Sequence, residues 1–161
     1  MTVTYCERWF RHKKKPIALI NESDARIRHE NRRLYTVVQG DLKAPECFIE
    51  INNDYVGVGV RDNLLREYLS YTFQEKKPGK LFLTMITHRA FDGQTDRVAG
   101  GTTYYFKEDG AAVIENEDFA ADSKTEKLVQ ADVSGNWEDY PMFGRYSTIL
   151  EVNRRGINPV S

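Results

Sequence analysis

Five side chains have the chemistry of nucleophiles or metal ligands: Cys6, Cys47, His12, His29 and His88. A catalytic cysteine needs a nearby histidine or helix N-terminus to hold its thiolate, and neither cysteine stands in such a sequence context. The histidines lie far apart, and none has a second ligand at the spacing typical of zinc sites. We therefore expect structural roles and reduced thiols, although a single disulfide between the two cysteines also fits the sequence.

Motifs for phosphate binding or hydrolysis are missing from the sequence. It contains no GxxxxGK[ST], no GxGxxG before a helix, no GxSxG and no HExxH. Carboxylate pairs such as Asp92 and Asp96 arise easily in a chain with 24 acidic residues. We expect no enzyme, no catalytic or metal-binding residue and no cofactor.

Charge is distributed unevenly along the 161 residues, although 23 basic and 24 acidic side chains leave a net charge of only -1. Residues 8–33 hold nine basic and three acidic side chains, while residues 108–139 hold ten acidic and two basic ones. The balanced total argues against a generally basic nucleic-acid binder, and a solvated turn explains the basic run 11–15 better than a nucleic-acid surface does. Each segment is still charged enough to attract an opposite partner.

Period-two alternation of apolar and polar residues dominates the chain and predicts an antiparallel sheet. The clearest hairpin spans residues 47–60, with Asn, Asn and Asp at 52–54 as the turn. The strand 55–60 places its valines on one side. Gly57 and Gly59 leave the other side bare, so either the strand bends there or another group lies against it.

Further elements follow from turn chemistry and alternation. A strand at 69–73 follows a helical turn at 62–67, but a single helix over 63–74 fits the same residues. The other expected elements are a central strand at 81–87, a hairpin at 102–115 with Asp109 and Gly110 at its tip, a loop at 116–126, a strand at 127–133, a helical turn at 146–150 and a frayed tail at 154–161.

These patterns predict a mainly β fold. We expect one domain over residues 1–161, an antiparallel meander curled into a barrel or half-barrel with one or two short helices; a sandwich is the nearest competitor. No apolar run approaches the roughly 20 residues of a membrane helix, and the N-terminus does not resemble a signal sequence. A cytoplasmic protein without membrane contact is expected.

Three stretches of the sequence carry a family resemblance: Leu81-Phe-Leu83, Tyr105-Phe-Lys-Glu-Asp-Gly110 and Asp132-Val-Ser-Gly-Asn-Trp-Glu-Asp-Tyr-Pro-Met-Phe-Gly-Arg-Tyr146. Over residues 56–150 the chain resembles bacterial immunity proteins of contact-dependent growth inhibition and related polymorphic toxin systems. The resemblance implies a cytoplasmic protein that binds one cognate toxin domain, as a monomer in a 1:1 complex, and blocks its active site. Such toxins are often nucleases, whose clefts are basic because they hold phosphates.

The first hypothesis is therefore a toxin inhibitor whose acidic surface enters a basic cleft, with no nucleic acid bound directly. The aromatic residues around Trp137 suit an interface, and they equally suit a C-terminal flap that closes the sheet with Trp137 and Phe143. The expected partner-binding residues are Glu115, Glu117, Asp118, Asp122, Glu126, Trp137, Glu138 and Asp139.

The alternative hypothesis is a small-molecule-binding β-barrel that resembles lipocalins. It places six residues near a cavity: Tyr55, Gly57, Gly59, Tyr71, Phe73 and Tyr105.

Overall fold

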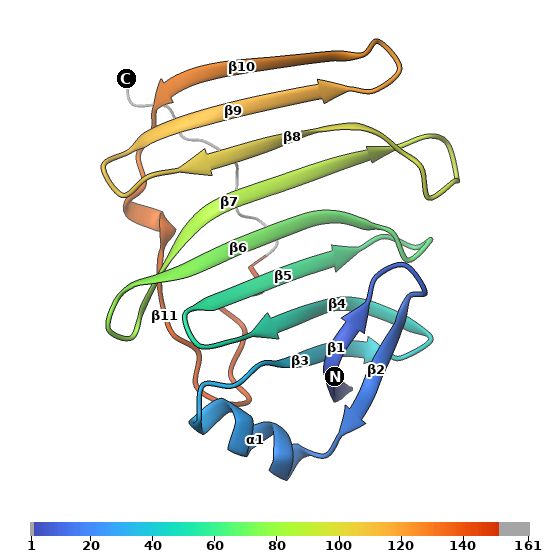
Figure 1. Ribbon diagram of the computed structural model, residues 1–161, viewed down its shortest axis with the longest axis vertical. Helices are drawn as coiled ribbons and strands as arrows, with labels where there is room; N and C mark the ends of the chain where they lie inside the picture. Colours follow the sequence, from blue (N-terminus) through green and yellow to red (C-terminus); the bar gives the residue numbers. More distant parts are fainter. Residues whose placement is uncertain (1, 152–161) are drawn as a thin grey trace.

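The computed structural model describes residues 2–151, which form one open antiparallel sheet (Figure 1). The strands lie in the order β10-β9-β8-β7-β6-β5-β4-β3-β1-β2, and β11 pairs with the start of β7. The predicted mainly β meander is confirmed, in its open and curled form. The bounds are β1 Val3–Phe10, β2 Lys15–Ile20, β3 Tyr35–Asp41, β4 Ala44–Ile51, β5 Tyr55–Arg61, β6 Glu67–Lys77, β7 Lys80–Phe91, β8 Val98–Phe106, β9 Ala111–Asp118, β10 Ser123–Gln130 and β11 Trp137–Asp139.

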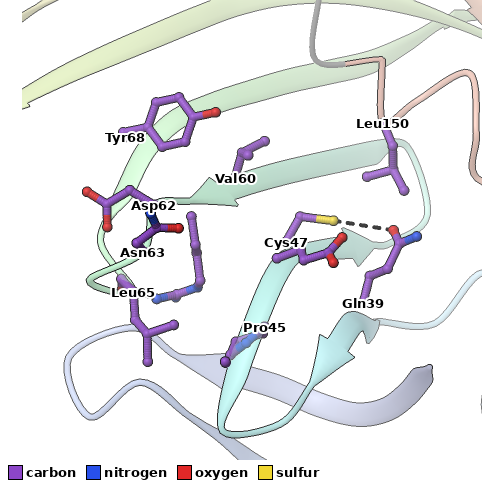
Figure 2. A pocket seen from close by; sticks show the side chains of 12 residues that line it. Gln39, Pro45, Cys47, Val60, Asp62, Asn63, Leu65, Tyr68 and Leu150 are labelled. Atoms are coloured by element: carbon purple, nitrogen blue, oxygen red, sulfur yellow. Dashed lines mark hydrogen bonds between the residues drawn. The ribbon is translucent and has the colours of Figure 1, made fainter. Parts of the chain in front are cut away.

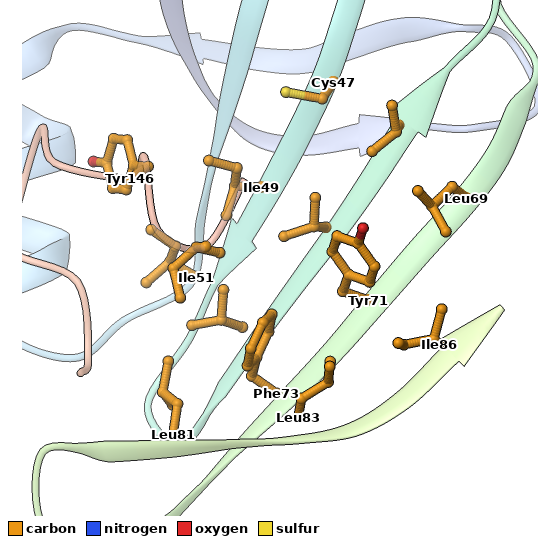
Figure 3. Close-up of a cluster of buried hydrophobic side chains, with 14 of the residues drawn as sticks. Cys47, Ile49, Ile51, Leu69, Tyr71, Phe73, Leu81, Leu83, Ile86 and Tyr146 are labelled. Carbon is orange, nitrogen blue, oxygen red and sulfur yellow. The ribbon is translucent and has the colours of Figure 1, made fainter. Parts of the chain in front are cut away.

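The hydrophobic core lies on one face of the sheet, called here the inner face, which carries Val58, Tyr71 and Ile86 in neighbouring strands. Figure 3 shows side chains of β4, β5, β6 and β7 pointing into this cluster. The C-terminal segment, residues 131–150, packs on it and contributes buried Tyr146 and Ile149. The expected C-terminal flap is therefore present.

Two aromatic contacts attach this segment to the sheet. The ring of Trp137 meets Phe82 edge to face at 4.9 Å, and Phe143 stacks on Tyr5 at 5.5 Å. Tyr140 adds a hydrogen bond, since its hydroxyl donates to the carbonyl oxygen of Asn52 at 2.6 Å. These contacts hold residues 137–143 of the flap against β7 at one point and β1 at another.

A smaller cluster covers the opposite face, called here the outer face, at the β1–β5 end. Cys6, Trp9, Val38 and Phe48 are buried there, with the Trp9 and Phe48 rings stacked at 6.2 Å. The guanidinium of Arg61 lies over both rings, a favourable contact between a cation and an aromatic face. This end of the sheet is therefore covered on both faces.

The hairpin predicted at 47–60 is confirmed as β4 and β5. Its bare side is filled by aromatic rings, because Tyr55 lies against Gly57 and Phe48 lies against Gly59. A side chain at either glycine would collide with these rings. The second hairpin, β8 and β9, is confirmed as well, and Gly110 at its tip has a φ of +89°.

Helix α1 (Glu22–Glu30) lies between β2 and β3 and was not predicted. The amide of Asp24 donates to the side chain of its N-cap residue, Asn21, at 2.8 Å. Ala25 is the helix's buried residue, so the segment lacks the apolar stripe by which amphipathic helices are recognised. A three-residue 3₁₀ turn, η1 (Ser134–Asn136), precedes β11.

Several boundary predictions were wrong. No helix forms at 62–67 or 63–74; the Asp62 carboxylate instead accepts hydrogen bonds from the Leu64 and Arg66 amides in a turn before β6. The loop expected at 116–126 is largely strand, since β9 runs to Asp118 and β10 begins at Ser123. Next to the turn both faces of this hairpin are solvated, so residues 116–126 have no hydrophobic period.

The single helical turn at 146–150 is confirmed by a hydrogen bond from the Leu150 amide to the Tyr146 carbonyl at 3.1 Å. The strand expected at 127–133 ends at Gln130. The tail predicted to fray, 154–161, lies outside the described residues. Within residues 2–151, no helix has the length and apolar character needed to cross a membrane.

Candidate functional site

The two ends of the sheet differ sharply in burial. In β5, six of seven residues are buried, whereas in β10 seven of eight are exposed and the remaining one is half-buried. In β9 the buried residue is Ala112. The β8–β10 end is therefore close to a single layer with solvent on its outer face.

Three glutamates lie together on the outer face of this end. Glu115 and Glu117 alternate along β9, and Glu126 of β10 stands directly opposite Glu115. Lys124 stands opposite Glu117 and forms an ion pair with Glu115 at 3.2 Å. The hydrogen bond and charge of Glu115 raise the pKa of Lys124. One lysine thus faces three carboxylates.

An apolar groove of about 500 Å³ runs beside the glutamates on the same face. Met85, Tyr105, Val113 and Leu128, from four successive strands, share one row across the sheet and line it. Leu128 is 83% exposed and Tyr105 is 41% exposed. We define these four residues, with Glu115, Glu117, Glu126 and Lys124, as the outer-face patch.

A smaller hollow of about 120 Å³ lies at the acidic end of the patch. Glu115, Glu117, Thr103 and the exposed ring of Phe119 line part of it. Partial burial raises the pKa of Tyr105, and the charge of Glu115 raises it further. Tyr105 therefore connects the apolar row to the carboxylates. The arrangement combines apolar contact area with anionic hydrogen-bond acceptors, the composition of a protein interface.

The predicted site residues divide into separate groups. Glu115, Glu117 and Glu126 come together in the patch. Asp118 accepts hydrogen bonds from the Ala120 and Ala121 amides, at 3.0 and 3.1 Å, inside the β9–β10 turn that also contains Asp122. These two aspartates therefore shape the turn.

Trp137, Glu138 and Asp139 form β11 at the opposite end of the strands. They pair with Phe82, Leu81 and Lys80 at the start of β7, whereas Glu117 lies across Gly101 from Arg89, near the end of β7. Asp139 forms an ion pair with Lys80. A partner anchored on Trp137 would lie away from the carboxylates of β9, so these predicted residues do not form one surface.

Four of the nine basic side chains in the segment 8–33 form ion pairs with acidic residues from elsewhere. Arg11 pairs with Glu50 at 2.9 Å and Glu67 at 3.1 Å, and Lys14 pairs with Asp96 at 2.9 Å. Arg28 and Arg32 form further ion pairs with Glu7 and Glu75. In β9 and β10, by contrast, four acidic side chains face only two lysines.

Neither cysteine is activated. Both are free and buried, and burial raises the pKa of Cys6 to about 11 and of Cys47 to about 12, so both thiols are protonated at neutral pH. Cys47 lines a cavity of about 510 Å³ and donates to Gln39 at 3.4 Å (Figure 2). Apolar side chains including Val60, Leu65 and Leu150 form much of its wall.

The histidines that the structure buries in part also have structural partners. Nδ1 of His29 lies 2.9 Å from the hydroxyl of Tyr35, and His88 meets the Tyr104 ring edge to face. Within residues 2–151, no three His, Cys, Asp or Glu side chains are grouped to hold a metal ion.

The six residues of the lipocalin-like hypothesis do not line a common cavity. Tyr71 and Phe73 face the inner side and are fully packed in the core. Gly57 and Gly59 alternate with the inward valines and face the outer side, as Tyr105 does. The cavity in Figure 2 is formed by other residues.

Comparison with known proteins leaves the function to be argued from geometry. The chain matches no protein-family model, no curated protein and no solved structure. Sequence reasoning missed the apolar half of the patch, namely Met85, Val113 and Leu128. Period-two alternation through 111–118 and 123–130 would have placed Val113, Glu115 and Glu117 on one face with Leu128 and Glu126.

Proposed function

We propose that this protein is an immunity protein that binds a basic bacterial toxin domain through the outer-face patch and covers its active site. The observation that supports this is the patch itself: three glutamates and one lysine beside an apolar groove, on a part of the sheet that no described segment covers. An apolar groove with an exposed leucine and tyrosine, rimmed by charged residues, is typical of a protein interaction site.

Electrostatics supports a basic partner. The carboxylates of Glu115 and Glu117 stand on alternate residues of one strand, about 7 Å apart along it, and Glu126 extends the row to the next strand. A nuclease cleft must hold phosphates and therefore presents cations. Complementary charge speeds the encounter, and the apolar groove supplies the area that holds the complex together.

We further propose a cytoplasmic protein that acts as a monomer in a 1:1 complex, without cofactor. The two buried, free thiols suit a reducing compartment. Binding at the patch would exclude substrate from the toxin, so the inhibitor needs no chemistry of its own.

The test is protection of growing bacteria. The probe is the C-terminal domain of the protein encoded directly upstream, expressed from an inducible plasmid with or without this protein. Wild type should restore growth, and the triple variant Glu115→Gln, Glu117→Gln, Glu126→Gln should lose protection because the amides keep the shape and remove the charge.

The matched control changes three exposed glutamates outside the patch: Glu30→Gln, Glu46→Gln, Glu108→Gln. It removes the same formal charge and should protect as wild type does. Equal protection by both triple variants would show that the patch is not the binding surface, and a toxic upstream domain that wild type fails to neutralise would contradict the proposed function.

A further inference from the structure

Strand β10 is an open edge of the sheet. It pairs with β9 over eight consecutive residues, from Ser123 opposite Asp118 to Gln130 opposite Ala111, without a bulge. Among the described residues it has no partner on its other side. Figure 1 shows it as the outermost, gently curved strand at one end of the sheet. Its second row of backbone hydrogen-bonding groups therefore faces solvent.

The hydrogen bonds around β10 show which groups these are. The amide of Ala131 donates to the Gly110 carbonyl at 2.8 Å, toward β9, and the amide of Phe119 donates to the Ala99 carbonyl at 2.9 Å, away from β10. Backbone groups of an antiparallel strand alternate in direction. The N–H and C=O groups of Lys124, Glu126 and Leu128 therefore point outward, and these residues also place their side chains on the outer face.

The other edge, β2, is protected against such pairing. Pro16 has no N–H to donate, and Ala18 has a φ of +52°, which interrupts the extended backbone. β10 contains neither a proline nor a residue with positive φ. Lys124 is drawn toward Glu115 on β9, which leaves the edge beside Glu126 and Leu128 accessible.

We propose that the partner adds a β-strand to the free edge of β10. This inference rests on the proposed function for the biological identity of the partner, while the edge and its chemistry come from the structure. Side chains directly opposite each other share a face. The added strand therefore presents a lysine or arginine opposite Glu126 and an apolar side chain opposite Leu128, next to the apolar groove.

A second copy of this chain fits the edge less well. Edge-to-edge pairing with matched faces would join two outer-face patches, so six glutamates and two lysines would share one continuous surface. Like charges brought together in this way repel. A basic strand instead neutralises the surface, and this selects a cationic partner.

The experiment adds to the full chain a disulfide-closed β-hairpin peptide whose outer strand carries lysine and leucine in turn on one face and threonine on the other, so that a lysine can stand opposite Glu126 and a leucine opposite Leu128. Amide hydrogen exchange is followed by NMR. The Lys124, Glu126 and Leu128 amides should exchange quickly in the free protein and at least about tenfold more slowly at saturating peptide. Thr125 and Lys127, whose amides already bond to β9, should change little. A peptide with glutamate in place of lysine should give no protection.

Leu128→Pro and Leu128→Thr form a matched pair of variants. Both remove the leucine, but only proline removes an outward N–H, and proline is tolerated on edge strands. The proline variant should bind the basic hairpin about tenfold more weakly than the threonine variant. A loss of this size is expected when one hydrogen bond between the two strands is removed.

Three results would overturn the inference: no slowing of the outward amides at saturating basic peptide, equal affinity of the two variants, or a dimer of the free protein in sedimentation that Leu128→Pro abolishes. The exchange measurement on the wild type is independent of how either variant folds. If toxin protection needs the glutamates but survives Leu128→Pro, the edge inference alone fails. If the peptide pairs with β10 but the upstream toxin is not neutralised, the proposed function alone fails.

Discussion

The β1–β5 end and the β8–β10 end of this sheet are built from the same antiparallel pairing and differ in what covers them. At the first end, the C-terminal segment packs on the inner face, while Trp9, Phe48 and Arg61 close the outer one. At the second end, β10 is solvated, and its Glu126, together with Glu115 and Glu117 of β9, stands beside the exposed Leu128. The difference indicates that one end supplies the stability and the other presents a surface.

The largest expected contrast lies between two apolar truncations. Phe73→Ala removes a ring that is 0% exposed in the core, and we expect it to lower the free energy of unfolding by about 3–5 kcal/mol. Leu128→Ala, at a side chain that is 83% exposed, should change it by less than about 0.5 kcal/mol. Urea denaturation of both variants measures the two values. Similar losses would mean that the β10 end belongs to the core.

A smaller difference in stability is expected between two variants that each lose one tyrosine hydroxyl, one in the C-terminal segment and one in the outer-face patch. Tyr140→Phe removes the hydrogen bond to the Asn52 carbonyl, which attaches the C-terminal segment, and should cost about 1 kcal/mol. Tyr105→Phe removes a hydroxyl from the outer-face patch and should leave stability nearly unchanged. Thermal unfolding of both variants in the same buffer measures the two losses of stability. A larger loss for Tyr105→Phe would reverse the assigned roles.

The smallest expected effect is the change in the free energy of unfolding when acid protonates His29 at the covered end. Burial, followed by the charge of Arg32, lowers the pKa of His29 below its ordinary value near 6.5. The unfolded chain then binds the proton more readily than the folded one, so the stability due to a neutral His29 is full above pH 6.5 and declines as the pH falls through the folded pKa.

His29→Gln should therefore reduce the loss of stability below pH 6.5, as measured by denaturant titrations at several pH values. Burial also lowers the pKa of His88, so part of the acid dependence should persist. His12→Gln, at an exposed position, is the control. An unchanged pH dependence in His29→Gln would show that this histidine is not held neutral by the fold.

Much of the fold was predictable because half-buried strands and their turns leave a strong pattern. The hairpin at 47–60 combines alternating valines with a polar turn, and the structure confirms it. Helix α1 was missed because it buries little more than Ala25. The strands through 116–126 were taken for a loop because acidic residues occupy both of their faces.

The candidate site was predictable only in part. Sequence proximity grouped Glu115, Glu117 and Glu126 with Trp137–Asp139, but the path of the chain takes β11 to the other end of the strands. The apolar row depends on which residues of four strands stand opposite one another. That register is set by turns and bulges, such as the irregularity between Ala90 and Phe91, and cannot be read from one strand alone.

The central claim is that the partner binds the uncovered end of the sheet. Hydrogen exchange followed by mass spectrometry, on the free protein and on the protein mixed with the toxin domain proposed as its partner, tests it most directly. We predict that binding slows exchange in residues 98–130 and leaves β3, β4 and α1 unchanged. Protection concentrated in β1–β4 or α1, with β8–β10 still exchanging as in the free protein, would contradict it.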